Sequence, residues 1–152
     1  MIKKNFFLIL LLSLLVGCGY TPIYKSDSKI SFDINEITLV GDWEINNFIK
    51  NSILKDLSKT SENKYNLNIK TDYSKTSVRK DSTGNTSAYE AVLKVEFCIK
   101  SNDLEKIFLI QEKFLIENFT DELDEKKFEK IVKENLANSI VNKFKIKLVN
   151  LK

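Results

Sequence analysis

Histidine is absent from this chain of 152 residues. Its absence removes the commonest general base, the commonest metal ligand and the side chain that titrates near neutral pH. A Ser-His-Asp hydrolase is therefore excluded, and the sequence has no Gly-x-Ser-x-Gly motif either. A glycosidase would need only two carboxylates, but Glu90 and Glu96 share the polar side of a predicted strand with Lys94, as on a solvated face. We expect that the chain is not an enzyme and has no catalytic residues.

Glycine and proline are scarce, with four glycines and one proline. Four scattered glycines cannot build the glycine-rich loop that cradles phosphates. Without histidine, only oxygen ligands for calcium or magnesium remain for a metal. The densest acidic cluster is Asp121, Glu122, Asp124 and Glu125, and the dipole of the helix predicted to begin there explains it. We expect neither a metal nor another cofactor.

Only two cysteines are present, Cys18 and Cys98, so the sequence carries no disulfide framework. Cys98 lies among apolar residues of a predicted strand, and we expect a buried small hydrophobic side chain there. An excess of one charge is also lacking, since 24 basic and 21 acidic residues are interspersed along the chain. A nucleic-acid-binding domain usually has a basic excess, so we expect no nucleic-acid partner.

The N-terminus has a basic start followed by an apolar run from Phe6 to Val16. This is the layout of a secretion signal. The run has about half of the ~20 residues that a permanent transmembrane helix needs, and no later run approaches that length. We expect residues 1–17 to be a signal peptide, and the mature chain to have no transmembrane span.

The residues Leu15, Val16, Gly17 and Cys18 resemble the lipobox of bacterial lipoproteins. The resemblance implies cleavage just before Cys18, which then carries S-diacylglycerol and N-palmitoyl groups, and it makes residues 18–30 a tether. Two or three acyl chains hold a protein stably to a membrane, whereas one holds it only marginally. Gly19 replaces the aspartate that retains enteric lipoproteins at the inner membrane, which implies the outer membrane. The alternative is an ordinary signal peptide with a chance cysteine.

The first part of the remaining chain predicts a strand and a helix. Apolar alternation from Phe32 to Leu39, with a phase slip at Asn35, predicts a strand with a bulge. Gly41 and Asp42 then offer a break and a helix cap. Apolar residues at helical spacing predict a helix from about Trp43 to Ser58.

Three strands are predicted next. Strict alternation from Tyr65 to Tyr73, and again from Tyr89 to Ile99, predicts two half-buried strands. The third strand, 107–119, is apolar on both faces, so its second face is covered by loops or meets a partner. The connections at 74–87 and 101–103 would make neighbouring antiparallel hairpins.

A long amphipathic helix is predicted from about Asp121 to the end of the chain. Its apolar stripe comprises Phe128, Ile131, Val132, Leu136, Ile140, Phe144 and Leu148. The predicted order is therefore β-α-β-β-β-α. We expect an α+β fold: a two-layer sandwich in which a four-stranded, mainly antiparallel sheet carries both helices on one face. Residues 31–152 would form this single domain.

Three basic residues, Lys75, Arg79 and Lys80, stand in the polar connection 74–87, where Asp81 is the only acidic residue. An arginine can grip a phosphate through two hydrogen bonds at once, so a hairpin tip with these residues could bind an anionic partner. The alternative is a solvated, mobile loop.

The lipobox continues as Cys18, Gly19, Tyr20, Thr21, Pro22, Ile23 and Tyr24. With the length and the element order, this run resembles the LPS-assembly lipoprotein LptE family, and the motif residues are Cys18, Gly19, Tyr20, Pro22 and Tyr24. The resemblance implies a lipid-anchored outer-membrane protein, facing the periplasm or enclosed in a barrel lumen. There it would plug the LptD β-barrel, assist its assembly and contact lipopolysaccharide during insertion.

On that implication, Lys75, Arg79 and Lys80 are candidates for contact with lipid A phosphates or with the barrel wall. The alternative function is a generic lipoprotein adaptor, in barrel assembly or envelope architecture, without a role in lipopolysaccharide transport.

Overall fold

The computed structural model describes residues 30–31, 33–55, 57–58, 64–102 and 104–149. The signal peptide, Cys18 and the motif residues Gly19, Tyr20, Pro22 and Tyr24 lie outside these described residues. Within the described part of the chain, no helix combines the length and the apolar character needed to cross a membrane.

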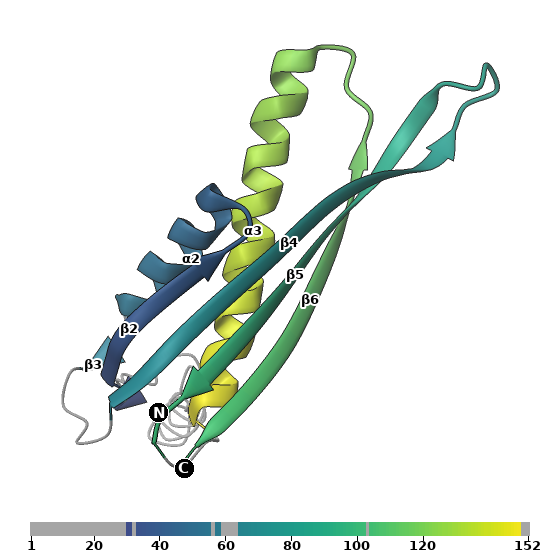
Figure 1. Ribbon diagram of the computed structural model, residues 1–152. Coiled ribbons are helices and arrows are strands. Elements are labelled where there is room, and N and C mark those ends of the chain that lie inside the picture. The colour runs from purple at the N-terminus through teal and green to yellow at the C-terminus, as the bar shows by residue number, and fades with distance from the viewer. Residues whose placement is uncertain (1–29, 32, 56, 59–63, 103, 150–152) are drawn as a thin grey trace, which may run out of the picture.

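Four strands form one mixed sheet, and they are β2 (Asp33–Val40), β4 (Lys64–Lys80), β5 (Thr86–Lys100) and β6 (Glu105–Glu117). Their order is β2-β4-β5-β6; β2 runs parallel to β4, and the other neighbouring pairs are antiparallel. Helices α2 (Trp43–Leu54) and α3 (Glu122–Val149) pack on the same face of this sheet (Figure 1). The predicted α+β sandwich with the order β-α-β-β-β-α is confirmed.

The connection from β2 to α2 follows the predicted local signals. The bulge in β2 is present as a register shift between Ile34 and Glu36. Gly41 turns the chain with a φ of +108°. Asp42 then caps α2, because its side chain accepts a hydrogen bond from the Ile45 N–H at 2.9 Å.

The end of α2 differs from the prediction. The helix stops at Leu54, whereas Leu57 and Ser58, predicted as its last turn, form the short strand β3. β3 (Leu57–Ser58) pairs in parallel with β1 (Ile30–Ser31), and this two-stranded sheet was not predicted. Strands of two residues are too short for any apolar alternation to reveal them.

The core lies between the sheet and the two helices. Alternate residues of β4 and β5 are buried there, and they include Leu67, Ile69, Leu93, Val95 and Phe97. The Phe144 ring of α3 stacks on the Phe97 ring at a centroid distance of 3.9 Å. The predicted stripe of α3 is wrong at Ile131, which is exposed; the buried residues of α3 are Val132, Leu136, Ala137, Ile140, Val141, Phe144 and Leu148.

The predicted loop 74–87 is wrong, because most of it belongs to strands. β4 continues to Lys80, β5 begins at Thr86, and residues such as Ser77 and Tyr89 pair across the ladder. The prediction relied on apolar alternation, which stops at Tyr73. The β4 residues 76–80 are exposed, and the tip of the hairpin projects from the body of the molecule (Figure 1), so its side chains need no apolar face to keep the strands paired.

Candidate functional site

The projecting end of the β4–β5 hairpin is the first candidate surface. β2 ends opposite Lys70, so the outer edge of β4 has no β2 neighbour beyond that residue. The turn is tied together by Asp81, whose side-chain oxygen accepts hydrogen bonds from the Thr83 N–H at 2.8 Å, the Thr83 hydroxyl at 2.7 Å and the Asn85 N–H at 3.0 Å. These bonds, that of the Thr83 hydroxyl above all, lower the pKa of Asp81. The tip is therefore a turn held by hydrogen bonds, and the Asp81 carboxylate already accepts bonds from within it.

Lys75 does not stand on the tip, contrary to the prediction. It lies on the helix-covered face of β4, where its Nζ pairs with Glu125 at 2.6 Å and with Glu129 at 2.9 Å. Its side chain is only 18% exposed, and the Nζ lies 4.7 Å from the centroid of the Tyr89 ring. Lys75 thus holds the start of α3 to the sheet and has its charge compensated within the fold.

A second lysine extends this arrangement. Lys133 of α3 lies 3.8 Å from a Glu129 oxygen and 3.9 Å from an Asp42 oxygen, and it stands over the Tyr73 ring. We call Lys75, Glu125, Glu129, Lys133, Asp42 and Tyr73 the ion cluster. It links β4, α3 and the cap of α2.

The ion cluster shifts the pKa values of Glu129, Lys75 and Tyr73. Burial raises the pKa of Glu129, but the hydrogen bond and charge of Lys75 outweigh burial and hold that pKa below its ordinary value. Burial likewise lowers the pKa of Lys75, and the bonds to Glu125 and Glu129 more than reverse this. Burial and the charge of Glu129 raise the pKa of Tyr73. These three shifts keep Glu129 ionised, and Lys75 and Tyr73 protonated, near neutral pH.

Arg79 and Lys80 lie nearer the tip and are exposed. The Arg79 guanidinium pairs with the Glu117 carboxylate of β6 at 2.6 Å. Lys80 is exposed, and no carboxylate of the described residues lies within ion-pair distance of it. The structure does not bring the three predicted residues together. Lys75 is enclosed beneath α3, Arg79 pairs with Glu117 across the sheet, and Lys80 has no ion-pair partner among the described residues.

The sequence prediction missed the partners of Lys75, since the acidic start of α3 was explained by the helix dipole alone. The signal that could have found them is the i,i+4 spacing of Glu125 and Glu129, which places both carboxylates on one helix face.

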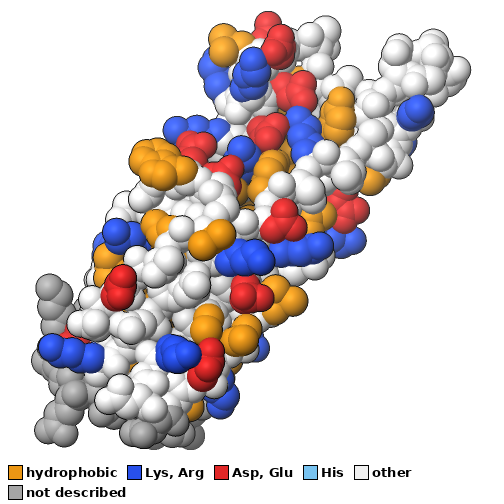
Figure 2. Space-filling view, in the orientation of Figure 1, with side chains coloured by type: hydrophobic (Ala, Val, Ile, Leu, Met, Phe, Trp, Pro, Cys, Tyr) orange, Lys and Arg blue, Asp and Glu red, His pale blue; other side chains and the backbone are white. Residues whose placement is uncertain are grey.

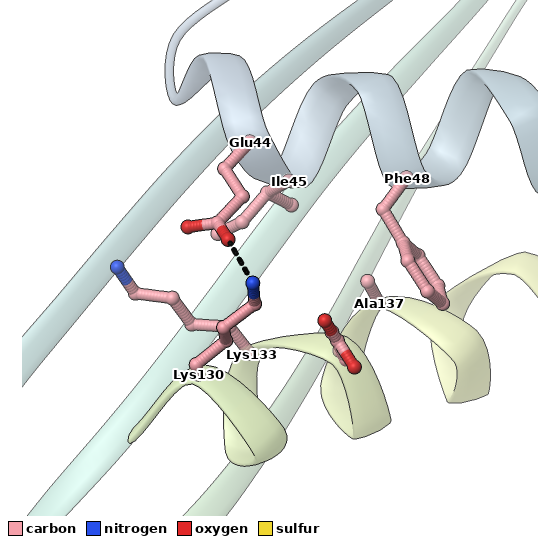
Figure 3. A pocket seen from close by; sticks show the side chains of 7 residues that line it. Glu44, Ile45, Phe48, Lys130, Lys133 and Ala137 are labelled. Carbon is pink, nitrogen blue, oxygen red and sulfur yellow. Dashed lines mark ion pairs between the residues drawn. The ribbon is translucent and has the colours of Figure 1, made fainter. Parts of the chain in front are cut away.

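A groove between α2 and α3 is the second candidate. Ile45 and Phe48 of α2 and Ala137 of α3 line it, with Lys130 and Lys133 at its rim (Figure 3). Its volume of about 140 Å³ is well below the roughly 300 Å³ of the smallest usual ligand pockets. Among the residues that the structure describes, no group of His, Cys, Asp or Glu is arranged to hold a metal ion.

The sheet face away from the helices is the third candidate. Ile107, Leu109 and Leu115 of β6 are exposed on it, so the second apolar face predicted for this strand exists and no described loop buries it. Cys98, predicted to be buried, lies half-buried on the same face, and its Sγ is 3.8 Å from a Glu105 oxygen. The reason is register, since Cys98 pairs with exposed Ile107.

The view of the surface in Figure 2 shows acidic, basic and apolar side chains interspersed rather than gathered by kind. One aromatic side chain is unusually open, because Trp43 at the start of α2 is 79% exposed. The electrostatic character of the surface in this view therefore comes from separate residues and not from a broad patch of one sign.

Solved structures of bacterial lipoproteins share this fold. Rare lipoprotein B from Shewanella oneidensis matches with a TM-score of 0.56 and 20% sequence identity, over 77% of this chain and 98% of that chain. Uncharacterized lipoprotein B from Nitrosomonas europaea matches with a TM-score of 0.58 and 15% identity, over 74% of this chain and 79% of that chain. A minor lipoprotein from Acinetobacter baumannii matches with a TM-score of 0.55 and 12% identity, over 78% and 95% respectively.

No protein-family model matches the sequence, and no curated protein is significantly similar to it. At identities of 12–20% these likenesses establish the fold, and the function has to be argued from the chain itself.

Proposed function

We propose that this chain is an outer-membrane lipoprotein of the LptE kind, which associates with and plugs the LptD β-barrel and assists the assembly of lipopolysaccharide at the cell surface. The observation that carries the proposal is a coincidence of two independent features. A lipobox ending in Cys18, with the Gly19 to Tyr24 run behind it, precedes a fold shared with three lipoprotein structures. On this proposal the chain makes and breaks no bonds and works by contact.

The shape and the surface support a plug. The molecule is elongated, with a long two-layer body and a polar hairpin beyond it (Figure 1). The interiors of outer-membrane barrels are polar, and a surface of interspersed charges with serine and threonine on the hairpin can form hydrogen bonds with such a wall. The bonded turn at Asp81 supplies a tip with a defined shape.

The experiment that tests the barrel association is affinity purification of the chain from envelopes in a mild detergent, followed by mass spectrometry. A large outer-membrane β-barrel protein should co-purify in a fixed ratio. Recovery of other envelope proteins without such a barrel would contradict the proposal and favour the generic adaptor.

Contact with lipopolysaccharide is proposed through Arg79 and Lys80 alone, since Lys75 is engaged in the ion cluster. The double variant Arg79→Ala/Lys80→Ala should bind lipopolysaccharide more weakly, because it removes the charge-assisted hydrogen bonds that phosphates would receive. The matched control is Lys70→Ala/Lys94→Ala, which removes the same charge from the open face of the sheet. Equal binding by both double variants in a lipopolysaccharide pull-down would contradict this contact.

A further inference from the structure

The outer side of the second half of α3 carries no charge along its middle. Six exposed residues recur there at intervals of three or four, which places them on one face of the helix; they are Ile131, Asn135, Asn138, Asn142, Ile146 and Val149. We call these six residues the α3 row. The buried residues of this half, such as Leu136, Ile140 and Phe144, lie on the opposite side of the helix, so the α3 row faces away from the sheet.

The exposed charged residues of the same half of α3 are engaged with β6. Lys143 pairs with the Glu112 carboxylate, and the Lys147 Nζ lies 5.8 Å from the centroid of the Phe108 ring. Both lysines therefore lie to one side of the α3 row. The row itself presents three asparagine amides between apolar residues, and each amide both donates and accepts hydrogen bonds.

The groove between α2 and α3 adjoins the α3 row. Its lining includes Ile45 and Phe48 of α2 and Ala137 of α3 (Figure 3). Glu134 lines it as well and lies one helical turn before Asn138 of the row. The groove is too small for a usual ligand, but the buried anchor side chains of protein interfaces commonly fill pockets of this kind.

α2 adds an exposed aromatic side chain to the helix layer. Trp43 comes directly before the groove residue Glu44 and is 79% exposed. The centres of protein interfaces are enriched in aromatic residues and depleted of charged ones, and tryptophan is frequent among the residues that dominate binding energy. The helix layer thus combines an uncharged row, a groove for one side chain and an open tryptophan.

The open face of the sheet has the opposite character. Exposed Lys70 and Asp72 of β4 lie on it, and Lys94 of β5 stands opposite Asp72. Lys113 stands among the exposed apolar residues of β6 on the same face. A partner that covered this face would remove these charges from water, which costs more free energy than the desolvation of amides.

We propose that the α3 row and the adjoining groove meet the inner wall of the barrel, whereas the open face of the sheet stays in contact with water. The inference rests on the proposed function and adds to it the side of the plug that docks. Barrel interiors are polar, and asparagine amides can bond to donors and acceptors alike on such a wall. A lipid surface would instead favour apolar and basic residues, and the middle of the α3 row has neither.

Photocross-linking of the full chain in intact envelopes tests which side docks. The Asn138→p-benzoylphenylalanine variant should form a covalent adduct with the barrel protein, because position 138 lies in the α3 row beside the groove. The matched control is Asn68→p-benzoylphenylalanine. Asn68 is also an exposed asparagine, and it lies on the open face of the sheet opposite Cys98, so this variant should form no adduct with the barrel. Mass spectrometry identifies the adducts.

Added charge tests the chemistry of the contact. The Asn138→Lys/Asn142→Lys variant should lower the amount of barrel recovered with the chain by about tenfold, because each lysine would be a charge without a partner in a closed interface. Lysine is favourable toward the C-terminus of a helix, and circular dichroism checks that the variant is folded. Asn138→Gln/Asn142→Gln keeps the amides and should retain the barrel. Asn66→Lys/Asn68→Lys adds the same charge to the open face and should also retain it.

Failure of this inference can be told apart from failure of the proposed function. If the natural chain recovers no barrel, both fall. If the barrel co-purifies, three results would overturn the docking face alone. They are the absence of a barrel adduct from position 138, a barrel adduct from position 68 that is at least as strong, and undiminished recovery of the barrel by folded Asn138→Lys/Asn142→Lys protein.

Discussion

Two lysines, Lys75 and Lys133, compensate acidic side chains at the start of α3 and at the cap of α2. Glu125 and Glu129 lie one helical turn apart and are both partly buried. Without a cation between them, each would be a partly desolvated charge beside a like charge. The ion cluster therefore has a structural role, even though its members are the kinds of residue that bind ligands elsewhere.

The substitution Lys75→Met should lower the free energy of unfolding by about 2 kcal/mol, because it leaves two partly buried carboxylates without their cation. Urea denaturation followed by far-UV circular dichroism measures the change. Lys80→Met is the matched control and should change stability by less than about 0.5 kcal/mol, since Lys80 is exposed. Similar losses in both variants would show that the ion cluster does not stabilise the fold.

Acid should weaken the ion pair between Lys75 and Glu129. The pKa of Glu129 in the folded chain lies below its ordinary value of 4.5, so its contribution to stability is complete above about pH 4.5 and is lost as the pH falls through the folded pKa. The Glu129→Gln variant has no such carboxyl to protonate. The stability advantage of the natural chain over this variant, measured by urea denaturation at a series of pH values, should shrink below pH 4.5. An advantage that stays constant down to pH 3 would contradict this assignment.

Among the elements, the turn from β2 to α2 depends on one residue. Gly41 has a φ of +108°, and a Cβ there would overlap the backbone carbonyl of Thr71. Gly84 in the hairpin turn also has a positive φ, but a Cβ there would meet no atom within 4 Å. A side chain at Gly84 would therefore meet backbone strain alone, whereas a side chain at Gly41 would meet both backbone strain and steric overlap.

The Gly41→Ala substitution should lower the free energy of unfolding by more than about 2 kcal/mol, because strain at φ adds to overlap with a neighbouring strand. Gly84→Ala should cost about 1 kcal/mol, since only the strain applies. Thermal or urea denaturation of the two variants checks the difference. Equal losses would mean that β4 can move away from position 41 without cost.

Apolar periodicity predicted the elements that bury a face, and it failed where the elements bury none. It located β5, the bulge of β2 and most of the stripe of α3, because burial there requires apolar residues at fixed spacing. It missed the end of β4 beyond Tyr73, because residues 76–80 are exposed and stay paired with β5 in the projecting end of the hairpin. The partners of Lys75 were missed for another reason, since a contact between residues 75 and 129 depends on how α3 crosses the sheet.

At the scale of the whole molecule, the two ends of the body carry different parts of the chain. β1, where the described chain begins, lies beside β3 at the end opposite the hairpin tip (Figure 1). On the proposed function, a lipid anchor at Cys18 would hold the β1 end of the body near the membrane. The barrel and lipopolysaccharide proposals both place the chain at the outer membrane.

Metabolic labelling with a palmitate analogue, followed by recovery of the chain from envelopes, tests that placement most directly. The account predicts that the natural chain carries the label and that Cys18→Ala, which keeps Cys98, carries none and stays uncleaved. A natural chain that remains unlabelled, or a Cys18→Ala variant that is labelled as strongly as the natural chain, would contradict it.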